Sequence, residues 1–323
     1  MKCILITGGA GFIGSSLADK LVDKEYSIVV VDNFNDYYDV DIKEKNVFNN
    51  LNKENYFLYK IDICDYEALE NVFINHKIDA IVHLAARAGV RPSIDDPILY
   101  QNVNNLGTNN ILEMARKYRV NNMILASSSS VYGNNKCVPF KETDSVDFAI
   151  SPYAATKKSN EVLGHVYHKL YDINMIFLRF FTVYGPRQRP DLAINKFTKL
   201  ILENKPIPLF GDGSTSRDYT YIDDIVNGII LSLDYVFSHK NVYEILNLGE
   251  NTPITLLQMV RTIEAALGKK AIINFLPMQP GDVYQTYADI SKARRLIGYN
   301  PTTSFEQGIR NFVVWYKEMN NYL

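Results

Sequence analysis

The 323 residues, of which 47% are apolar, are enough for one large domain or two ordinary domains with buried cores. The formal net charge of −2 offers no basic field for nucleic acid or an anionic membrane, and no apolar run approaches the roughly 20 residues that span a bilayer. The three cysteines and five histidines lack the spacing of a disulfide framework or a metal site, so we expect a cytoplasmic protein without a metal.

The amino terminus predicts a strand, a tight glycine turn and a helix in direct succession. Residues 2–7 (KCILIT) form a short apolar run typical of a buried strand, and Ile13, Leu17 and Leu21 then recur on one helical stripe. Glycines between such elements allow a tight turn and let backbone N–H groups approach a pyrophosphate at the helix start. The glycines are Gly8, Gly11 and Gly14. Together these features predict a dinucleotide-binding turn.

A second apolar run, residues 27–31, ends at Asp32. A carboxylate at this point accepts hydrogen bonds from the two hydroxyls of an adenosine ribose and repels a 2′-phosphate. No Arg or Lys follows Asp32 before Lys43. The sequence therefore favours NAD over NADP.

Further short apolar runs alternate with helix-like stretches along the first half. The runs are residues 56–62, 80–84, 123–127 and 175–179, and the later helix-like stretches are 103–118 and 153–171. Such alternation predicts a parallel sheet with helices on both faces, whose ligands bind at the carboxyl ends of the strands. Asp62, Ala85 and Ala86 fall at such ends, where the two alanines serve either close approach of a cofactor or tight packing.

Tyr153 and Lys157 share one face of a predicted helix, because residues i and i+4 are neighbours there. A phenol loses its proton near a pH of about 10, and a neighbouring ammonium lowers that pKa. Tyr153 is therefore a candidate base and acid near neutral pH, suited to taking the proton of an alcohol while hydride leaves the same carbon. A serine cluster, residues 127–130, ends the strand upstream.

From Phe180 the pattern changes to proline-rich loops and short strand signals. Helices are expected from Thr255, where Gln258 completes a capping box, and from Phe305. We therefore expect an α/β fold, with a Rossmann-type doubly wound parallel sheet in residues 1–179 that binds NAD. A smaller α/β domain in residues 180–323 is expected to bind the substrate, with some segments crossing back.

Three motifs are spread over nearly the whole chain. They are the Gly8, Gly11, Gly14 turn, the Ser128, Tyr153, Lys157 set and residues 217–224 (RDYTYIDD). Together they resemble the extended short-chain dehydrogenase/reductases that act on nucleotide sugars. Within that group the chain is most similar to UDP-glucuronate 4-epimerases, through residues 88–93 (AGVRPS), 179–190 (RFFTVYGPRQRP) and 279–283 (QPGDV).

The resemblance implies reversible 4-epimerisation of UDP-glucuronate to UDP-galacturonate with NAD that stays bound. Tyr153 would remove the proton of the 4-hydroxyl while hydride passes from C4 to the nicotinamide. The 4-keto sugar would then turn over in the pocket and take the hydride back on its other face. Lys157 would hold the nicotinamide ribose, and Ser128 would hydrogen-bond the reacting oxygen. The residues implied to contact NAD are Gly8, Gly11, Phe12, Ile13, Gly14, Asp32, Asn33, Asp62, Ile63, Leu84, Ala85, Ala86, Asn104, Tyr153, Lys157 and Phe181.

The serine cluster separates the reaction types of the family that this chain resembles. Sugar 4,6-dehydratases carry an acid pair where Ser129 and Ser130 stand, because elimination of water needs an extra acid and base. UDP-glucuronate decarboxylases carry a glutamate in that stretch. Neutral hydroxyls can instead donate hydrogen bonds to a substrate carboxylate, although strand-end capping is an equally open role. The residues expected around the uronate are Ser128, Ser129, Ser130, Thr182 and Arg91.

Two positions differ from UDP-galactose 4-epimerases, which usually have asparagine at Thr182 and arginine at Gln279. Loss of that arginine leaves the diphosphate to other guanidinium groups, whose forks suit phosphate oxygens. Each candidate could alternatively be a surface charge. The candidates are Arg187, Arg189 and Arg217, and Asp282 is expected to meet a ribose hydroxyl or to orient one of them. The resemblance gives no role to Arg87.

Three other functions stay open at this point: 4-epimerisation of a neutral UDP-hexose or its N-acetyl form, UDP-glucuronate decarboxylation, and NAD sensing without catalysis. Family members pair two helices across a twofold axis into a four-helix bundle, so a homodimer is expected through residues 103–118 and 153–171. Apolar residues beyond one stripe of these helices include Ile111, Leu112, Val162, Leu163 and Val166.

Overall fold

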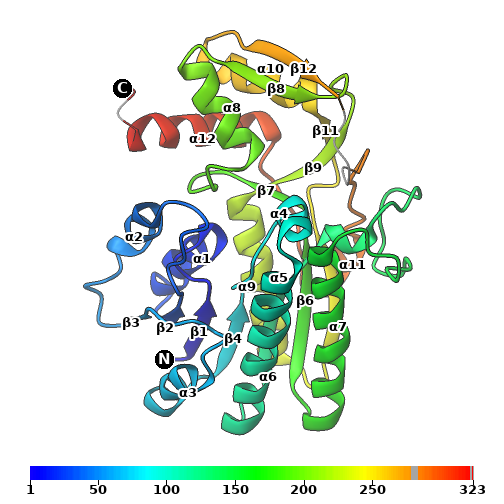
Figure 1. Ribbon diagram of the computed structural model, residues 1–323. Helices are drawn as coiled ribbons and strands as arrows, with labels where there is room; N and C mark the ends of the chain where they lie inside the picture. The colour runs from blue at the N-terminus through cyan, green and yellow to red at the C-terminus, as the bar shows by residue number, and fades with distance from the viewer. Residues whose placement is uncertain (278–282, 321, 323) are drawn as a thin grey trace.

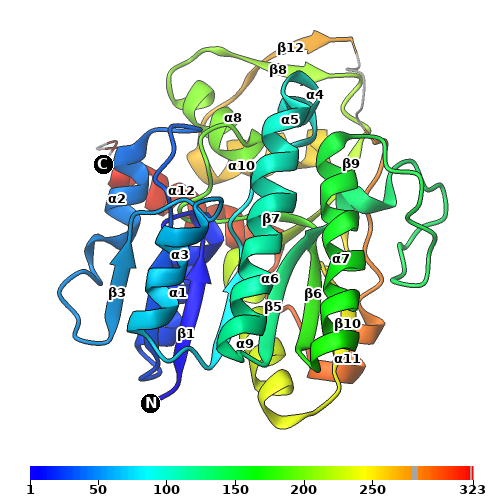
Figure 2. The ribbon, with the colours of Figure 1, turned by 60° about the horizontal axis from the view of Figure 1, so that its bottom comes forward.

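A parallel sheet of seven strands forms the centre of the molecule (Figures 1 and 2), in the order β10-β6-β5-β4-β1-β2-β3. The structure is a computed structural model and describes residues 1–277, 283–320 and 322. The strands are β1 (Cys3–Thr7), β2 (Ser27–Val31), β3 (Tyr56–Tyr59), β4 (Ala80–His83), β5 (Asn122–Ser128), β6 (Asn174–Phe180) and β10 (Tyr243–Leu248). The six strands expected in the first half are thus confirmed.

Helices cover both faces of this sheet because alternate strand residues point to opposite sides. Ile4 and Ile6 of β1 pack in one hydrophobic cluster with α1 and α9, whereas Leu5 packs in the other cluster, with α3, α6 and α7. The helices are α1 (Phe12–Val22), α2 (Val40–Phe48), α3 (Tyr66–Asn75), α4 (Val90–Asp95), α5 (Pro97–Tyr100), α6 (Gly107–Tyr118), α7 (Pro152–Tyr171) and α9 (Ile222–Ser238). The expected doubly wound α/β fold is confirmed.

A smaller layer lies beyond the carboxyl ends of the large sheet, at the top of Figure 1. Strands β7 (Thr182–Tyr184), β9 (Ser216–Tyr221) and β11 (Pro253–Thr255) form one small sheet, and β8 (Pro206–Phe210) pairs with β12 (Ile272–Leu276). The helices here are α8 (Ala193–Leu202), α10 (Leu256–Leu267) and α12 (Phe305–Met319). Thr255 and Gln258 form the expected capping box, each side chain accepting from the other residue's backbone N–H.

The second half of the chain returns to the large sheet. Strand β10 pairs with β6, helix α9 packs on β5, β6 and α1, and α11 (Ser291–Ile297) contacts both β10 and α9. Residue 180 therefore marks the first exit from the large sheet, and we keep the division into residues 1–179 and 180–323 as a proposal.

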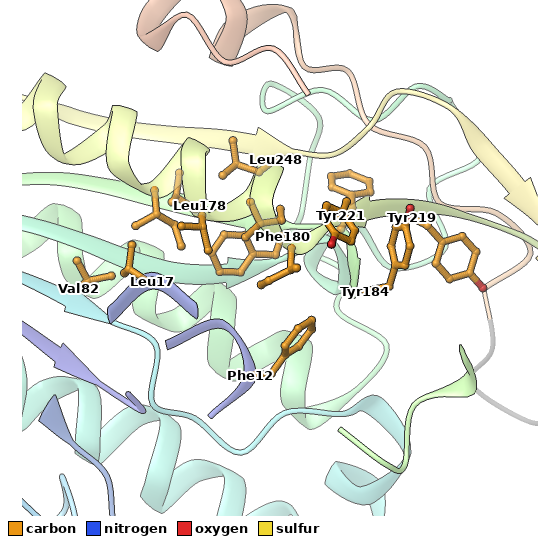
Figure 3. Close-up of a cluster of buried hydrophobic side chains, with 14 of the residues drawn as sticks. Phe12, Leu17, Val82, Leu178, Phe180, Tyr184, Tyr219, Tyr221 and Leu248 are labelled. Atoms are coloured by element: carbon orange, nitrogen blue, oxygen red, sulfur yellow. The ribbon is translucent and has the colours of Figure 1, made fainter. Parts of the chain in front are cut away.

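One hydrophobic core joins the two layers (Figure 3). Leu17, Val82 and Leu178 pack beside the large sheet, Phe180 lies at the end of β6, and the aromatic rings of Tyr184, Tyr219 and Tyr221 continue the same cluster into the small sheet. Because this core is continuous, the small layer is held against the carboxyl ends of the parallel strands, where ligands of such sheets bind. Every helix in the described part of the chain falls short of the length and apolarity that a membrane crossing needs.

Candidate active site

A cavity of about 430 Å³ runs along the carboxyl ends of β1, β2, β4, β5 and β6, under the small layer. It includes the point between β1 and β4 where the strand order reverses, which is the usual ligand site of such sheets. Most of the residues expected at the site line this one cavity. They are Gly8, Gly11, Phe12, Ile13, Gly14, Asp32, Asn33, Asp62, Ile63, Leu84, Ala85, Ala86, Ser128, Tyr153, Lys157, Phe181, Thr182 and Arg189.

The glycine turn packs backbone against backbone. A β-carbon on Gly8, whose φ is +71°, would lie 2.8 Å from the amide nitrogen of Ala85, and one on Gly14 would lie 2.3 Å from the carbonyl oxygen of Gly8. Side chains at these positions are therefore excluded by space. The turn presents its backbone to the cavity at the amino end of α1, where the helix dipole favours an anion.

Asp32 stands at the end of β2 with its carboxylate fixed. Its two oxygens accept hydrogen bonds from the amides of Ala10 (3.1 Å) and Phe34 (2.9 Å). The loop that follows folds back, so that the buried Lys43 ammonium lies 3.8 Å from Asp32 and donates to the carbonyl oxygen of Asn35. The sequence spacing had placed no cation near Asp32. The preference for NAD therefore rests on the carboxylate and not on an absence of cations.

Asp62 follows β3, the strand that pairs with β2, and is held as a carboxylate. Burial opposes its ionisation, but hydrogen bonds from the Cys64 amide (2.8 Å) and the Asn33 side chain (2.7 Å) lower its pKa overall. Such a carboxylate can accept hydrogen bonds from a nucleoside.

Helix α7 brings Tyr153 and Lys157 to the cavity. Its start is fixed by Ser151, whose hydroxyl accepts from the Ala154 amide, and by a proline at the first helical position. One turn later, the buried Lys157 ammonium donates to the carbonyl oxygen of Ala126 at 2.8 Å. Burial lowers the pKa of Lys157 to about 8, against the opposing charge of Glu161.

The acidity expected for the phenol is not found. Burial raises the pKa of Tyr153, and a hydrogen bond with Ser128 and the charge of Arg189 only partly oppose this. The expectation that Lys157 lowers this pKa was wrong for the structure, because the ammonium is directed to a backbone carbonyl. Arg189, on another loop, is the cation that acts on Tyr153.

Ser128 also has a local role at the end of β5. Its hydroxyl accepts from the Ser130 amide (3.1 Å) and donates to the Ser130 hydroxyl (3.1 Å), which starts the 3-10 turn Ser129–Tyr132. Ser129 and Ser130 are partly buried beside the cavity but do not line it. Strand-end capping was an open role for Ser129 and Ser130, and in the structure Ser128 performs it.

The structure does not bring six of the expected site residues that it describes to the cavity. Asn104 is buried in π-helical turns, where its amide holds the backbone N–H and C=O of Arg87. Arg187 pairs with Asp19 of α1 at 2.7 Å, whereas Arg91 is exposed near Phe210. The other residues outside the lining are Ser129, Ser130 and Arg217 of β9, and Asp282 and Gln279 lie outside the described residues.

Sequence reasoning missed an aromatic group over the cavity. The Tyr37 hydroxyl donates to the Ala88 carbonyl oxygen at 2.9 Å, as does Tyr100 at 3.2 Å. The Tyr100 ring lies edge-on to Tyr153 with centroids 6.2 Å apart, and the Arg189 guanidinium carbon is 5.1 Å from the Tyr37 ring. The sequence feature that could have indicated this group is the pair of tyrosines at positions 37 and 38, shortly after Asp32.

Comparison with known proteins gives the context of this site. The sequence model of the family described as GDP-mannose 4,6 dehydratase matches residues 5–312. The UDP-glucuronate 4-epimerase of Thermodesulfobacterium geofontis is 44% identical, over 98% of this chain and 97% of its own length.

Two solved structures share the whole fold. Bacillus cereus UDP-glucuronic acid 4-epimerase, in complex with UDP-glucuronic acid and NAD, is 37% identical with a TM-score of 0.90, over 98% of this chain and 99% of that one. Thermotoga maritima UDP-glucose 4-epimerase, with UDP-glucose, is 33% identical with a TM-score of 0.90 and the same coverage.

The family description names a dehydratase, whereas these similar proteins are epimerases. The chain itself has neutral Ser129 and Ser130 where a dehydratase needs an acid pair. The resemblance drawn from the sequence motifs is thereby confirmed. The chain belongs to the GDP-mannose 4,6-dehydratase family, among its nucleotide-sugar 4-epimerases of the short-chain dehydrogenase/reductase fold.

Proposed function

We propose that this protein is a cytoplasmic NAD-dependent epimerase that interconverts UDP-glucuronate and UDP-galacturonate at C4. The observation that carries the proposal is that Ser128, Tyr153 and Lys157 line the same cavity as the glycine turn and Asp32. Relatives with UDP-glucuronate 4-epimerase activity over nearly the full length support the choice of substrate.

The residues of the cavity fit a dinucleotide. The backbone around Gly8 and Gly14 leaves no room for a β-carbon, so the turn and the start of α1 face the cavity with little but backbone, as a pyrophosphate site requires. Asp32 would accept hydrogen bonds from the hydroxyls of the adenosine ribose, and Asp62 would accept a hydrogen bond from the adenine. When bound, NAD supplies a hydride acceptor and donor for C4 of the sugar.

Side chains of the protein transfer the proton of the sugar 4-hydroxyl. Tyr153 takes the proton of the sugar 4-hydroxyl and returns it after the sugar has turned over. Ser128, which lines the cavity with Tyr153, holds the reacting oxygen. Lys157 orients the nicotinamide ribose from the floor of the cavity, where its ammonium is fixed by Ala126. The positive charge of Arg189 favours the phenolate that the proton transfer requires.

Neutral hydroxyls are proposed to hold the uronate group. Ser128 and Thr182 line the cavity, with Ser129 and Ser130 beside it. These groups donate hydrogen bonds without repelling a carboxylate. Firm binding matters because a 4-keto uronate is a β-keto acid, which loses CO2 when it is held poorly.

The diphosphate is proposed to meet Arg189 first, because this guanidinium lines the cavity. Roles of Arg91, Arg187 and Arg217 toward the nucleotide stay proposals that require side-chain movement toward the substrate. The role of Asp282 also stays a proposal.

The test is incubation of the pure protein with a panel of UDP-sugars, followed by NMR of the products. We expect UDP-glucuronate to be converted to UDP-galacturonate. UDP-glucose and UDP-N-acetylglucosamine should stay unchanged. Turnover of UDP-glucose without turnover of UDP-glucuronate would contradict the carboxylate argument. A UDP-pentose would identify a decarboxylase.

A homodimer through α6 and α7 completes the proposal. The two helices lie side by side (Figures 1 and 2), and α7 exposes Val162, Val166 and Leu170 at 55%, 43% and 65%, four residues apart on one stripe. Ile111 and Leu112, also expected in this surface, are completely buried in the core of the subunit. Both residues belong to the hydrophobic cluster that α6 shares with α3 and the large sheet, so a partner subunit cannot reach them.

A further inference from the structure

Arg87 differs from the other cations of the cavity. Four lysine or arginine side chains line it among the described residues: Lys43, Arg87, Lys157 and Arg189. Lys43 lies beside Asp32, Arg189 is paired with Asp191 at 2.8 Å, and Lys157 donates to a backbone carbonyl. For Arg87, no carboxylate of residues 1–277, 283–320 and 322 lies within salt-bridge distance, and its guanidinium rests over the Tyr37 ring at 5.1 Å.

The backbone of Arg87 is fixed at a defined place over the groove. Asn104 accepts from its N–H at 2.8 Å and donates to its C=O at 3.0 Å. Only Ala86 separates it from Ala85, whose backbone nitrogen lies against the glycine turn. The side chain therefore starts from the wall opposite the loop that follows β2.

The guanidinium crosses the groove toward that loop. Tyr37, on which it rests, belongs to the loop. Beyond the larger effects of burial, the charge of Arg87 also acts on the pKa values of Asp62 and Lys43, so it lies close to both. Tyr37 in turn donates to the Ala88 carbonyl oxygen and carries the second guanidinium, that of Arg189. Arg87 and Tyr37 thus bridge the two walls above the glycine turn.

Three cations of this cavity lie close enough together to influence one another. Burial lowers the pKa of Lys43, the nearby Asp32 carboxylate opposes this, and the charges of Arg87 and Arg189 lower it further. Like charges destabilise one another, and a guanidinium fork suits phosphate oxygens. We propose that Arg87 binds the cofactor's pyrophosphate from the open side of the groove, with Tyr37 as the ring that holds its guanidinium in place. This inference rests on the proposed use of NAD.

The test compares Arg87→Gln and Arg87→Lys with Arg119→Gln, which removes the same charge from an exposed position at the end of α6. NAD affinity is measured by titration calorimetry on protein freed of nucleotide, at low and high salt and without any sugar. NAD retained through dialysis of the purified protein is the second readout, and thermal melting confirms folding.

We expect Arg87→Gln to weaken NAD binding about tenfold or more and to reduce its dependence on salt, because one charged contact to phosphate is lost. Arg87→Lys should keep part of the affinity, and Arg119→Gln all of it. Equal NAD affinity and salt dependence in Arg87→Gln and Arg119→Gln would overturn the proposal. So would a raised KM for the UDP-sugar with unchanged NAD affinity. Because no sugar is present in the titration, its outcome does not depend on which UDP-sugar is the substrate.

Discussion

Tyr153 carries the proton in this account, and its environment is specific to that task. The ring is packed edge-on against Tyr100, and Ser128 and Arg189 stabilise the ionised phenol that burial disfavours. Replacement by phenylalanine keeps the ring and removes the proton carrier. We expect Tyr153→Phe to lower kcat by about a hundredfold to ten-thousandfold.

NAD content serves as the control for this variant, since the hydroxyl is not needed to hold the dinucleotide. Turnover measured by NMR should fall to that extent, while the NAD released on denaturation stays at the parent's level. A variant as active as the parent would remove Tyr153 from the mechanism.

The protonation of Lys157 should make activity depend on pH. Its pKa is lowered by burial to about 8, so the ammonium is lost in the folded protein as pH rises through that value. We expect activity to fall above a pH of about 8, because the neutral amine is a weaker partner for the ribose. Lys157→Arg, which cannot lose its charge in this range, should lack this alkaline limb, whatever its absolute rate.

The free energy of unfolding should rise over the same pH range in which activity falls. An unfolded chain keeps the lysine protonated up to a pH of about 10.4, so between the two values the unfolded state binds more protons. The contribution of Lys157 to the free energy of unfolding therefore rises with pH from about 8. Urea titrations of the parent and of Lys157→Met at three pH values would measure it. An identical pH dependence in both proteins would contradict the lowered pKa.

At the residue scale, the sequence predicted what depends on local spacing. The glycine turn, Asp32 and the Tyr153–Lys157 pair all line the cavity as expected. Contacts that depend on how a loop folds back were not predictable. Lys43 reaches Asp32 only because the chain after β2 reverses into α2. Arg187, whose φ is +68°, pairs with Asp19 of α1, and no sequence pattern indicated this contact.

Among the elements, α7 is tied to the sheet one turn beyond Lys157. Glu161 accepts from the Ser127 hydroxyl at 2.7 Å and from two nitrogens of Arg179, both at 2.8 Å. Both charged side chains are 1% exposed. Because Ser127 and Arg179 belong to β5 and β6, this ion pair fixes the helix that carries Tyr153 and Lys157 to the two strands beneath it.

Glu161→Gln should be costly, since it leaves the buried Arg179 guanidinium without its counter-charge. We expect the free energy of unfolding in urea to fall by about 3–5 kcal/mol. Lys158→Gln is the matched control, because Lys158 lies 4.0 Å from the same carboxylate but is 29% exposed, and a loss below about 1 kcal/mol is expected. Similar losses in the two variants would contradict this role of the pair.

Sequence patterns predicted strands β1 to β6 and helices α1, α6, α7, α10 and α12, and they missed irregular backbone. The helix expected over residues 103–118 begins instead with the π-helical turns Gln101–Leu106 and becomes regular only at Gly107. We attribute this irregular start to contacts with residues that are distant in the sequence. Asn104 is turned inward to hold the backbone of Arg87, and its amide also donates to Thr156 of α7 at 3.0 Å. A side chain that serves distant groups leaves no periodic signal.

For the whole molecule, the continuous core holds the small layer over the cavity (Figure 3). Which segments of the second half return to the large sheet could not be predicted, because β10 and β6 are joined by pairing between residues about seventy positions apart and not by a local motif. The shared core implies that a change in the small layer affects the site through packing.

The proposed dimer gives a prediction at this scale. Val166→Glu places a charge in the exposed stripe of α7, and Val314→Glu places the same charge on an exposed valine of α12. The parent and Val314→Glu should scatter light as dimers of the 36.9 kDa chain, and Val166→Glu should shift toward the monomer. A parent that is monomeric in dilute solution would contradict the dimer.

The fate of the hydrogen on C4 tests the central claim, reversible oxidation at that carbon, most directly. UDP-glucuronate with deuterium at C4 would be incubated with the protein in ordinary water, and the UDP-galacturonate formed would be analysed by mass spectrometry and NMR. The account predicts that the product keeps the deuterium at C4, because the hydride removed from C4 returns to the same carbon from the bound cofactor. Replacement of the label by solvent hydrogen would contradict it.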